Sequence, residues 1–255
     1  MASKPKKNAR YDLKAADRKR NLFVQIGLTS VVVVFAAALI LYIMMSADEK
    51  PTAGETKSVR VESSSVIKKE GTEEPKAVIS LYEDALCPHC ASLEQQFGPT
   101  LTNIADSGAA AIDYYMVGIL DRPQNDNYPS RAGAAAYCVA DDSVDAFKRF
   151  HAALFAQQPS ELGSSYPDNS RLVELARQAG AAGTVPECIE KGTYVDMVAG
   201  MAAAAGIKST PTMRINGEEY QYSTPQALVA KIEEIVGDVP GLEAAPPAQA
   251  PTPAS

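Results

Sequence analysis

Residues 77–90 of the chain read AVISLYEDALCPHC, which places two cysteines directly after a short apolar run. The run Ala77–Tyr82 has the length and composition of a buried strand, and a helical pattern of apolar residues follows the second cysteine. We therefore expect Cys87 at a strand-to-helix junction, where free backbone N–H groups and the helix dipole favour a thiolate. Pro88 suits the first helical turn because its missing N–H would have no intrahelical partner there.

The spacing of the two cysteines predicts redox chemistry. Cys90 follows Cys87 by one helical turn, so its sulfur can attack a mixed disulfide formed on Cys87. His89 lies between them, and a protonated imidazole would stabilise the Cys87 thiolate further. A stabilised thiolate stabilises the reduced form, which makes the disulfide a stronger oxidant. A Cys-x-x-Cys motif after a strand is typical of such a centre.

Two other interpretations of this motif have to be weighed. Zinc sites also use Cys-x-x-Cys, but a closed zinc site needs four ligands, and no second pair at short spacing exists in the sequence. Cys87, His89 and Cys90 alone would make only a partial site, so we expect no metal ion and no cofactor. A purely structural disulfide across one helical turn would be strained and readily reduced.

The other two cysteines, Cys138 and Cys188, lie far apart in a stretch of Ala-rich helical sequence. An even cysteine count outside the cytoplasm favours a structural disulfide between them. Closing so long a loop would stabilise the fold by roughly 4 kcal/mol in the chain-entropy model. The alternatives are two buried free thiols, or a shuttle pair that exchanges with Cys87.

A charge-free stretch near the N-terminus predicts a membrane anchor. Residues 22–45 are apolar apart from three positions, and a helix of this length reaches about 36 Å, enough to cross a hydrocarbon core of roughly 30 Å. A cleaved signal peptide is the alternative, although its apolar region is usually shorter, about 7–15 residues. The basic segment 1–21 should stay in the cytoplasm by the positive-inside rule, so all four cysteines should lie outside.

The charge of the chain is divided unevenly. The first 20 residues carry a net charge of +6, so the remainder sums to -13 against -7 for the whole chain. A domain this acidic is not expected to bind nucleic acid, because phosphate contacts need an excess of Lys and Arg.

Composition divides the part after the anchor into three segments. Residues 46–75 are rich in polar residues and are predicted to be a tether, with a short strand near 57–67. Residues 76–236 carry regular patterning and should form the folded domain. Residues 237–255 are rich in Pro and Ala and are predicted to be a solvated tail.

Within the folded domain, a strand, a helix, a second strand, a helical block, a hairpin and a last helix follow one another. The second strand is expected at 111–117, and the hairpin turns at Asn216-Gly217, a dipeptide that supplies positive φ at both positions. The last helix should begin after the capping residue Thr224. The helical block is expected at about 130–141, 143–157, 169–180 and 186–205. This order fits an α/β, thioredoxin-like core with an inserted α-helical domain at about 120–207.

Several motifs together resemble the DsbA-like thiol–disulfide oxidoreductases of the thioredoxin superfamily, over about residues 76–236. They are the Cys87–Cys90 motif, the segment Gly206–Thr212, the Ile215–Gly217 turn and the stretch Phe150–Phe155. With its expected anchor and second cysteine pair, the chain is similar to the membrane-anchored mycobacterial members of that family.

The resemblance implies roles for further residues. Pro211, preceded by Thr210, would be a cis-proline that faces the active-site disulfide. Asp84 and Glu94 stand where family members often carry acids, and a buried Glu94 could relay the proton of Cys90; the alternative is a solvated acid on a helix. His151 is similar to a residue of the family's helical insertion, and we interpret it as a packing residue.

These observations lead to an expected function. The chain should be a single-pass membrane protein, monomeric, whose outer domain introduces disulfides into reduced secreted or cell-envelope proteins. The resemblance implies a membrane reoxidant of the DsbB or vitamin-K-epoxide-reductase type. The alternatives are a thiol reductase of the same fold, for example in cytochrome c maturation, and a non-catalytic anchored binding module.

Overall fold

A computed structural model describes Leu28, residues 33–37 and residues 51–248 of the chain. The expected cytoplasmic segment 1–21 lies outside the described residues, and so does most of the expected anchor 22–45. Among the described residues, no helix has the length and apolar character that a membrane crossing requires. The chain divides into two units, Met1–Glu49 and Lys50–Ser255, and the second of these contains the sheet and the cysteines.

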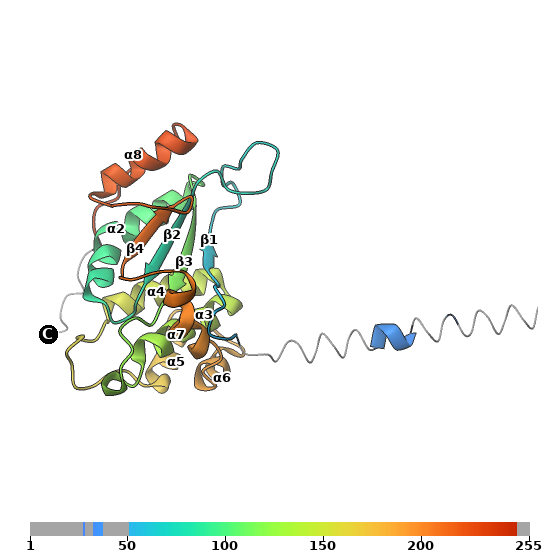
Figure 1. Ribbon diagram of the computed structural model, residues 1–255. Helices are drawn as coiled ribbons and strands as arrows, with labels where there is room; N and C mark the ends of the chain where they lie inside the picture. The colour runs from blue at the N-terminus through green and yellow to red at the C-terminus, as the bar shows by residue number, and fades with distance from the viewer. Residues whose placement is uncertain (1–27, 29–32, 38–50, 249–255) are drawn as a thin grey trace, which may run out of the picture. The chain divides into compact units, whose positions relative to one another are not determined.

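A mixed five-stranded sheet forms the centre of the second unit (Figure 1). Its spatial order is β1 (Val59–Val61), β3 (Ala111–Met116), β2 (Val78–Glu83), β4 (Thr212–Ile215) and β5 (Glu218–Glu219). The two central strands run parallel, with Ile79 opposite Ile112, and the remaining neighbours are antiparallel. Ile79, Leu81 and Ile112 are fully buried, which explains why both central segments read as apolar runs.

Helices cover the sheet and fill the connection between β3 and β4. The helix that follows the first cysteine is α2 (Pro88–Asp106), and α8 (Pro225–Val236) packs beside it. Between β3 and β4 lie α3 (Tyr128–Asp142), α4 (Val144–Ala156), α5 (Asn169–Gln178), α6 (Val185–Glu190) and α7 (Val195–Ala204), after a 3-10 turn at Pro123–Asn125. The predicted thioredoxin-like α/β core with a helical insertion is confirmed.

The prediction of one helix over 186–205 is wrong in detail. The segment forms α6 and α7, and turns separate them. Gly192 lies in these turns with φ of 59°, a left-handed conformation that glycine adopts without a steric penalty. Both short helices pack on α3.

The short strand expected in the tether is present as β1. It pairs antiparallel with β3 at the edge of the sheet. Arg60 donates from Nε and Nη2 to the two carboxylate oxygens of Asp113 on β3, each at 2.8 Å. This paired geometry is the strong form of a charge-assisted hydrogen bond, and it fixes the register of the edge strand.

The prediction of a solvated tail is wrong for residues up to Ala248, which pack along α2. Leu242 is buried, the side chain of Asn103 donates to the carbonyl of Glu243, and the N–H of Ala248 donates to the carbonyl of Gln95 at 2.8 Å. Pro99 lies inside α2 and has no N–H, so it cannot bond the carbonyl of Gln95 four residues before it. The tail supplies the missing donor.

Candidate active site

The two cysteines of the Cys-Pro-His-Cys motif lie at the first turn of α2, where β2 has just ended. Cys87 occupies the N-cap position in an extended conformation, with φ of -76° and ψ of 117°, and Pro88 begins the helix. The N–H of Cys90 donates to the carbonyl of Cys87 at 3.0 Å. Both thiols are free and buried, Cys87 at 6% exposure and Cys90 at 0%, whereas Pro88 and His89 are exposed.

The pKa values of the two thiols are shifted in opposite directions. The pKa of Cys87 is lowered from 9.0 to about 5, chiefly because the Cys90 thiol donates a hydrogen bond to it, and backbone N–H groups of Cys90 and His89 add to the effect. Burial raises the pKa of Cys90 well above its usual range, and the hydrogen bond to Cys87 adds to that rise. One sulfur is therefore a thiolate at neutral pH while its neighbour keeps its proton.

A second segment, just before β4, faces the first cysteine. The Thr210–Pro211 peptide bond is cis, and the carbonyl oxygen of Thr210 lies 3.4 Å from Cys87 Sγ. A groove of about 280 Å³ beside this contact is lined by His89, Gln96, Tyr222 and the same two residues, Thr210 and Pro211. An extended chain that approaches Cys87 therefore meets a preformed surface.

Asp84 connects the turn before Cys87 to the segment after β3. Its Oδ1 accepts the N–H of Leu86, and its Oδ2 accepts the N–H of Leu120, both at 2.8 Å. Burial raises the pKa of Asp84 to about 7. Through these two hydrogen bonds, Asp84 helps to hold the active-site turn in place.

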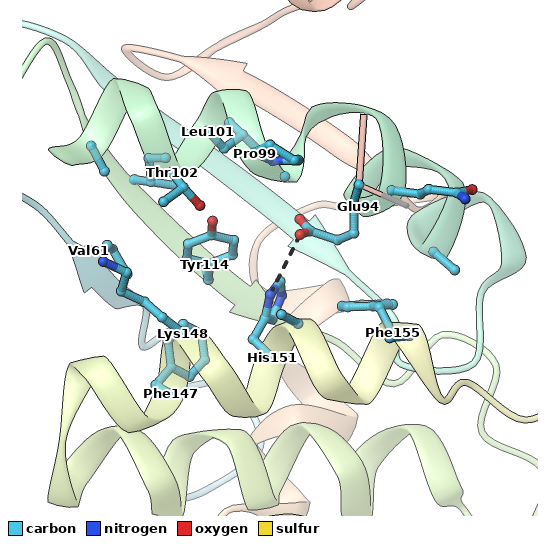
Figure 2. A pocket seen from close by; sticks show the side chains of 18 of the residues that line it. Val61, Glu94, Pro99, Leu101, Thr102, Tyr114, Phe147, Lys148, His151 and Phe155 are labelled. Carbon is cyan, nitrogen blue, oxygen red and sulfur yellow. Dashed lines mark ion pairs between the residues drawn. The ribbon is translucent and has the colours of Figure 1, made fainter. Parts of the chain in front are cut away.

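Glu94 is almost buried, with 11% of its side chain exposed, so it is not a solvated helix acid. It lies beside two other buried groups, Glu83 at the end of β2 and His151 on α4. The Nε2 atom of His151 is 2.9 Å from Glu83 Oε2, and its Nδ1 atom is 3.8 Å from Glu94 Oε2 (Figure 2). Burial raises the pKa of Glu94 to about 8, raises that of Glu83, and lowers that of His151.

The interpretation of His151 as a packing residue needs correction. Its ring does contact aromatic neighbours, with its centroid 4.7 Å from that of Tyr114 and 5.0 Å from that of Phe155. Both ring nitrogens, however, face carboxylates. His151 is therefore a polar member of the site as well as a part of the core.

A family model described as Thioredoxin matches residues 67–234. The chain belongs to the thioredoxin family. The match spans strands β2 to β5, the Cys-Pro-His-Cys helix and the helical insertion, and it ends within α8.

Comparison with solved structures shows which members of the thioredoxin family this chain resembles. Oxidised DsbA of Mycobacterium tuberculosis is 59% identical with a TM-score of 0.72, over 73% of this chain and 96% of that one. The reduced disulfide bond oxidoreductase DsbG of Mycobacterium tuberculosis is 59% identical with a TM-score of 0.71, over 72% of this chain and 90% of that one. These likenesses identify the chain as a DsbA-like thiol–disulfide oxidoreductase.

A curated relative matches a smaller part of the chain. The serine/threonine-protein kinase PknE of Mycobacterium tuberculosis is 29% identical over 126 residues, which are 48% of this chain and 22% of the kinase. The chain thus spans about a fifth of the length of the curated relatives that it matches.

The expected second disulfide is confirmed in this DsbA-like domain. Cys138 on α3 and Cys188 on α6 are bonded, with their Cα atoms 5.9 Å apart. The bond joins two helices of the insertion, and neither sulfur belongs to the Cys-Pro-His-Cys motif.

Sequence reasoning missed two residues of the site. Glu83 stands at the end of an apolar strand, and Gln158 follows α4, where its side chain donates to the carbonyl oxygens of Ala85 and Cys87. Glu83 could have been found from the sequence, because an acidic residue is unusual in an apolar run that is suited to a buried strand. Gln158 gave no comparable signal, because its role depends on how the insertion folds back over the turn.

Proposed function

We propose that the Cys87–Cys90 pair introduces disulfide bonds into reduced secreted or cell-envelope proteins outside the cytoplasm. The observation that carries the proposal is the contrast between the two thiols, since the pKa of Cys87 is lowered to about 5 and that of Cys90 is raised. A thiolate that is stable in the reduced protein makes the corresponding disulfide oxidising. The same contrast argues against a purely structural pair.

In the proposed reaction, a substrate thiolate attacks Cys87 Sγ of the oxidised pair. The Cys87–Cys90 bond breaks, a mixed disulfide forms on Cys87, and Cys90 leaves with the electron pair and takes up a proton. A second substrate thiolate then attacks the substrate sulfur of the mixed disulfide, which forms the substrate disulfide and releases Cys87 as a thiolate. Glu94, in the cluster beside Cys90, is placed to exchange that proton when the pair closes again.

The groove beside Thr210 and Pro211 supports the proposal that these two residues help to hold the substrate. The carbonyl of Thr210 points at the sulfur that a substrate would reach, and Tyr222 lines the groove from the segment after β5. Each cycle leaves the enzyme reduced, so a membrane oxidant of the DsbB or vitamin-K-epoxide-reductase type would have to restore the pair. Residues 22–45 would anchor the domain near such a partner.

Trapping of mixed disulfides tests the assignment of the two sulfurs. Cys90→Ala should accumulate mixed disulfides with substrates that already carry a disulfide, because Cys87 attacks that bond and no neighbouring thiol can release the bound half, whereas Cys87→Ala should accumulate none. The reverse pattern would overturn the assignment. A measured potential as low as that of a reductase would favour the alternative function, and no thiol turnover would favour a binding module.

The proposed location has its own test. A reporter that is active only outside the cytoplasm, fused to the C-terminus, should be active, and the mature protein should retain residues 1–47. A soluble form that begins near Asp48 would contradict the anchor.

A further inference from the structure

Glu83, Glu94 and His151 form a compact set of metal-ligating side chains beneath the cysteine helix. One ligand atom from each lies within 4.8 Å of the others. They come from three elements, β2, α2 and α4, so the tertiary fold and not local sequence brings them together. Figure 2 shows Glu94 and His151 directed toward one another among the side chains that line a pocket.

The hydrogen bonding of this cluster is incomplete in the described part of the chain. The Oε1 atoms of both Glu83 and Glu94 are buried and receive no hydrogen bond from any other described residue, while a side-chain hydrogen bond between the two acids shifts the pKa of each. Glu83 is fully buried, so water does not reach its side chain from the surface. A buried carboxylate oxygen without a donor is costly, and such an orphan calls for an ion or a water molecule that satisfies it.

A cavity borders two members of the cluster, Glu94 and His151, and gives them access to solvent. It has a volume of about 470 Å³, and Glu94 and His151 line it together with exposed residues such as Ser92 and Gln95. Gly98 keeps its wall open beside the acid, because a Cβ at that position would lie 3.0 Å from Glu94 Oε2. The basic side chain at the cavity, Lys148, bonds Asp106 at 3.1 Å.

We propose that Glu83, Glu94 and His151 bind a divalent transition-metal ion, with zinc as the ion that this donor set suits. Two carboxylates balance the ion's charge, and the imidazole favours a first-row transition metal over calcium or magnesium, which take oxygen ligands. Three protein ligands leave a coordination position for water, and the cavity has room for it. The site shares Glu94 with the proton exchange proposed for Cys90, but its binding of an ion does not depend on the function proposed for the Cys87–Cys90 pair.

Calorimetric titration of zinc into the purified full chain tests the site. The protein is first oxidised, so that Cys87 and Cys90 are paired and cannot bind zinc themselves. One zinc per chain should bind, and His89→Ala should bind it equally well, because this exposed histidine is the chain's only other imidazole. Losing a residue that only hydrogen-bonds a metal ligand costs about 10–100-fold in metal affinity. Losing a charged ligand should cost more, so Glu94→Gln should weaken zinc binding by at least about 100-fold.

A second measurement needs no substitution within the cluster and therefore avoids its effect on folding. The chain has two histidines, so the ring signals of His89 and His151 can be separated by nuclear magnetic resonance with the His89→Ala variant as reference. Zinc should shift the His151 signals and leave those of His89 unchanged. An absence of binding, equal affinity in Glu94→Gln, or a shift confined to His89 would each overturn the proposal.

Discussion

The side-chain nitrogen of Gln158 lies 3.0 Å from the carbonyl oxygen of Cys87 and 3.1 Å from that of Ala85. The carbonyl of Cys87 also accepts the N–H groups of Cys90 and Ala91, so it begins the hydrogen bonding of α2. One residue of the helical insertion thus holds both ends of the turn that presents the first cysteine.

Gln158→Ala should lower the free energy of unfolding by about 1–3 kcal/mol, because it removes the side-chain donor to the carbonyl of Ala85 and one of the three donors to that of Cys87. Denaturant unfolding of the reduced protein measures this loss. Gln157→Ala is the matched control, since Gln157 bonds Arg171 at the surface, and its effect should stay within about 0.5 kcal/mol. Equal losses in the two variants would contradict a special role for Gln158.

Ultraviolet titration of the thiolate should show Cys87 ionising near pH 5. Cys90→Ala should raise this pKa, because the Cys90 thiol supplies the largest stabilising hydrogen bond. His89→Ala should raise it as well, whereas Gln96→Ala, which changes an uncharged residue of the same groove, should not. A titration that is identical in all three variants would show that these groups do not set the acidity of Cys87.

The acidity of Cys87 also makes the stability of the reduced protein depend on pH. The folded-state pKa of about 5 lies below the ordinary 9.0, so the thiolate's contribution is complete above pH 9 and is lost as the pH falls through 5. The reduced form should therefore gain stability relative to the oxidised form between those values as the pH rises. Unfolding curves of both forms across this range measure the difference, and a constant difference would contradict the prediction.

Replacing Cys138 and Cys188 together by Ala should destabilise the domain by up to roughly 4 kcal/mol, because the closed loop no longer restricts the unfolded chain. Oxidase activity of the folded fraction should stay near that of the parent, since the bond lies outside the Cys-Pro-His-Cys motif. Thiol counting offers a check without substitution: the denatured oxidised domain should show no free thiol, and mild reduction should release only two. Release of all four would favour a shuttle pair.

Truncation tests the packed part of the tail. A chain that ends after Pro240 loses buried Leu242 and the donor to the Gln95 carbonyl, so its free energy of unfolding should fall by about 2 kcal/mol or more. A chain that ends after Ala248 keeps all of these contacts and serves as the control. If both truncations unfold like the full chain, the contacts contribute nothing measurable.

Local sequence patterns predicted most of the elements and the position of the two cysteines at a strand-to-helix junction well. The apolar run before Cys87, the proline after it and the Asn216-Gly217 turn each express a local preference, and all three lie in the structure as predicted. The cis geometry before Pro211 came from family resemblance, because most X-Pro bonds are trans and a single sequence does not reveal the exceptions.

The contacts that the sequence did not predict are tertiary. The carbonyl of Gln95 lacks a donor because of Pro99, and nothing nearby in the chain indicates that Ala248 supplies it. The pairing of His151 with Glu83 likewise joins α4 to β2 across the fold. Tertiary packing brings such partners together, and the local spacing of residues in the sequence does not reveal it.

The covalent link between α3 and α6 is a product of the same disulfide-forming chemistry that we propose for this chain. Four cysteines allow three complete pairings, and a single one joins Cys138 to Cys188 while leaving Cys87 with Cys90. Under the proposed function, each newly made chain must therefore be oxidised at Cys87 and Cys90 before it can oxidise others. Copies that are already oxidised could then also form the Cys138–Cys188 bond that stabilises the next copy.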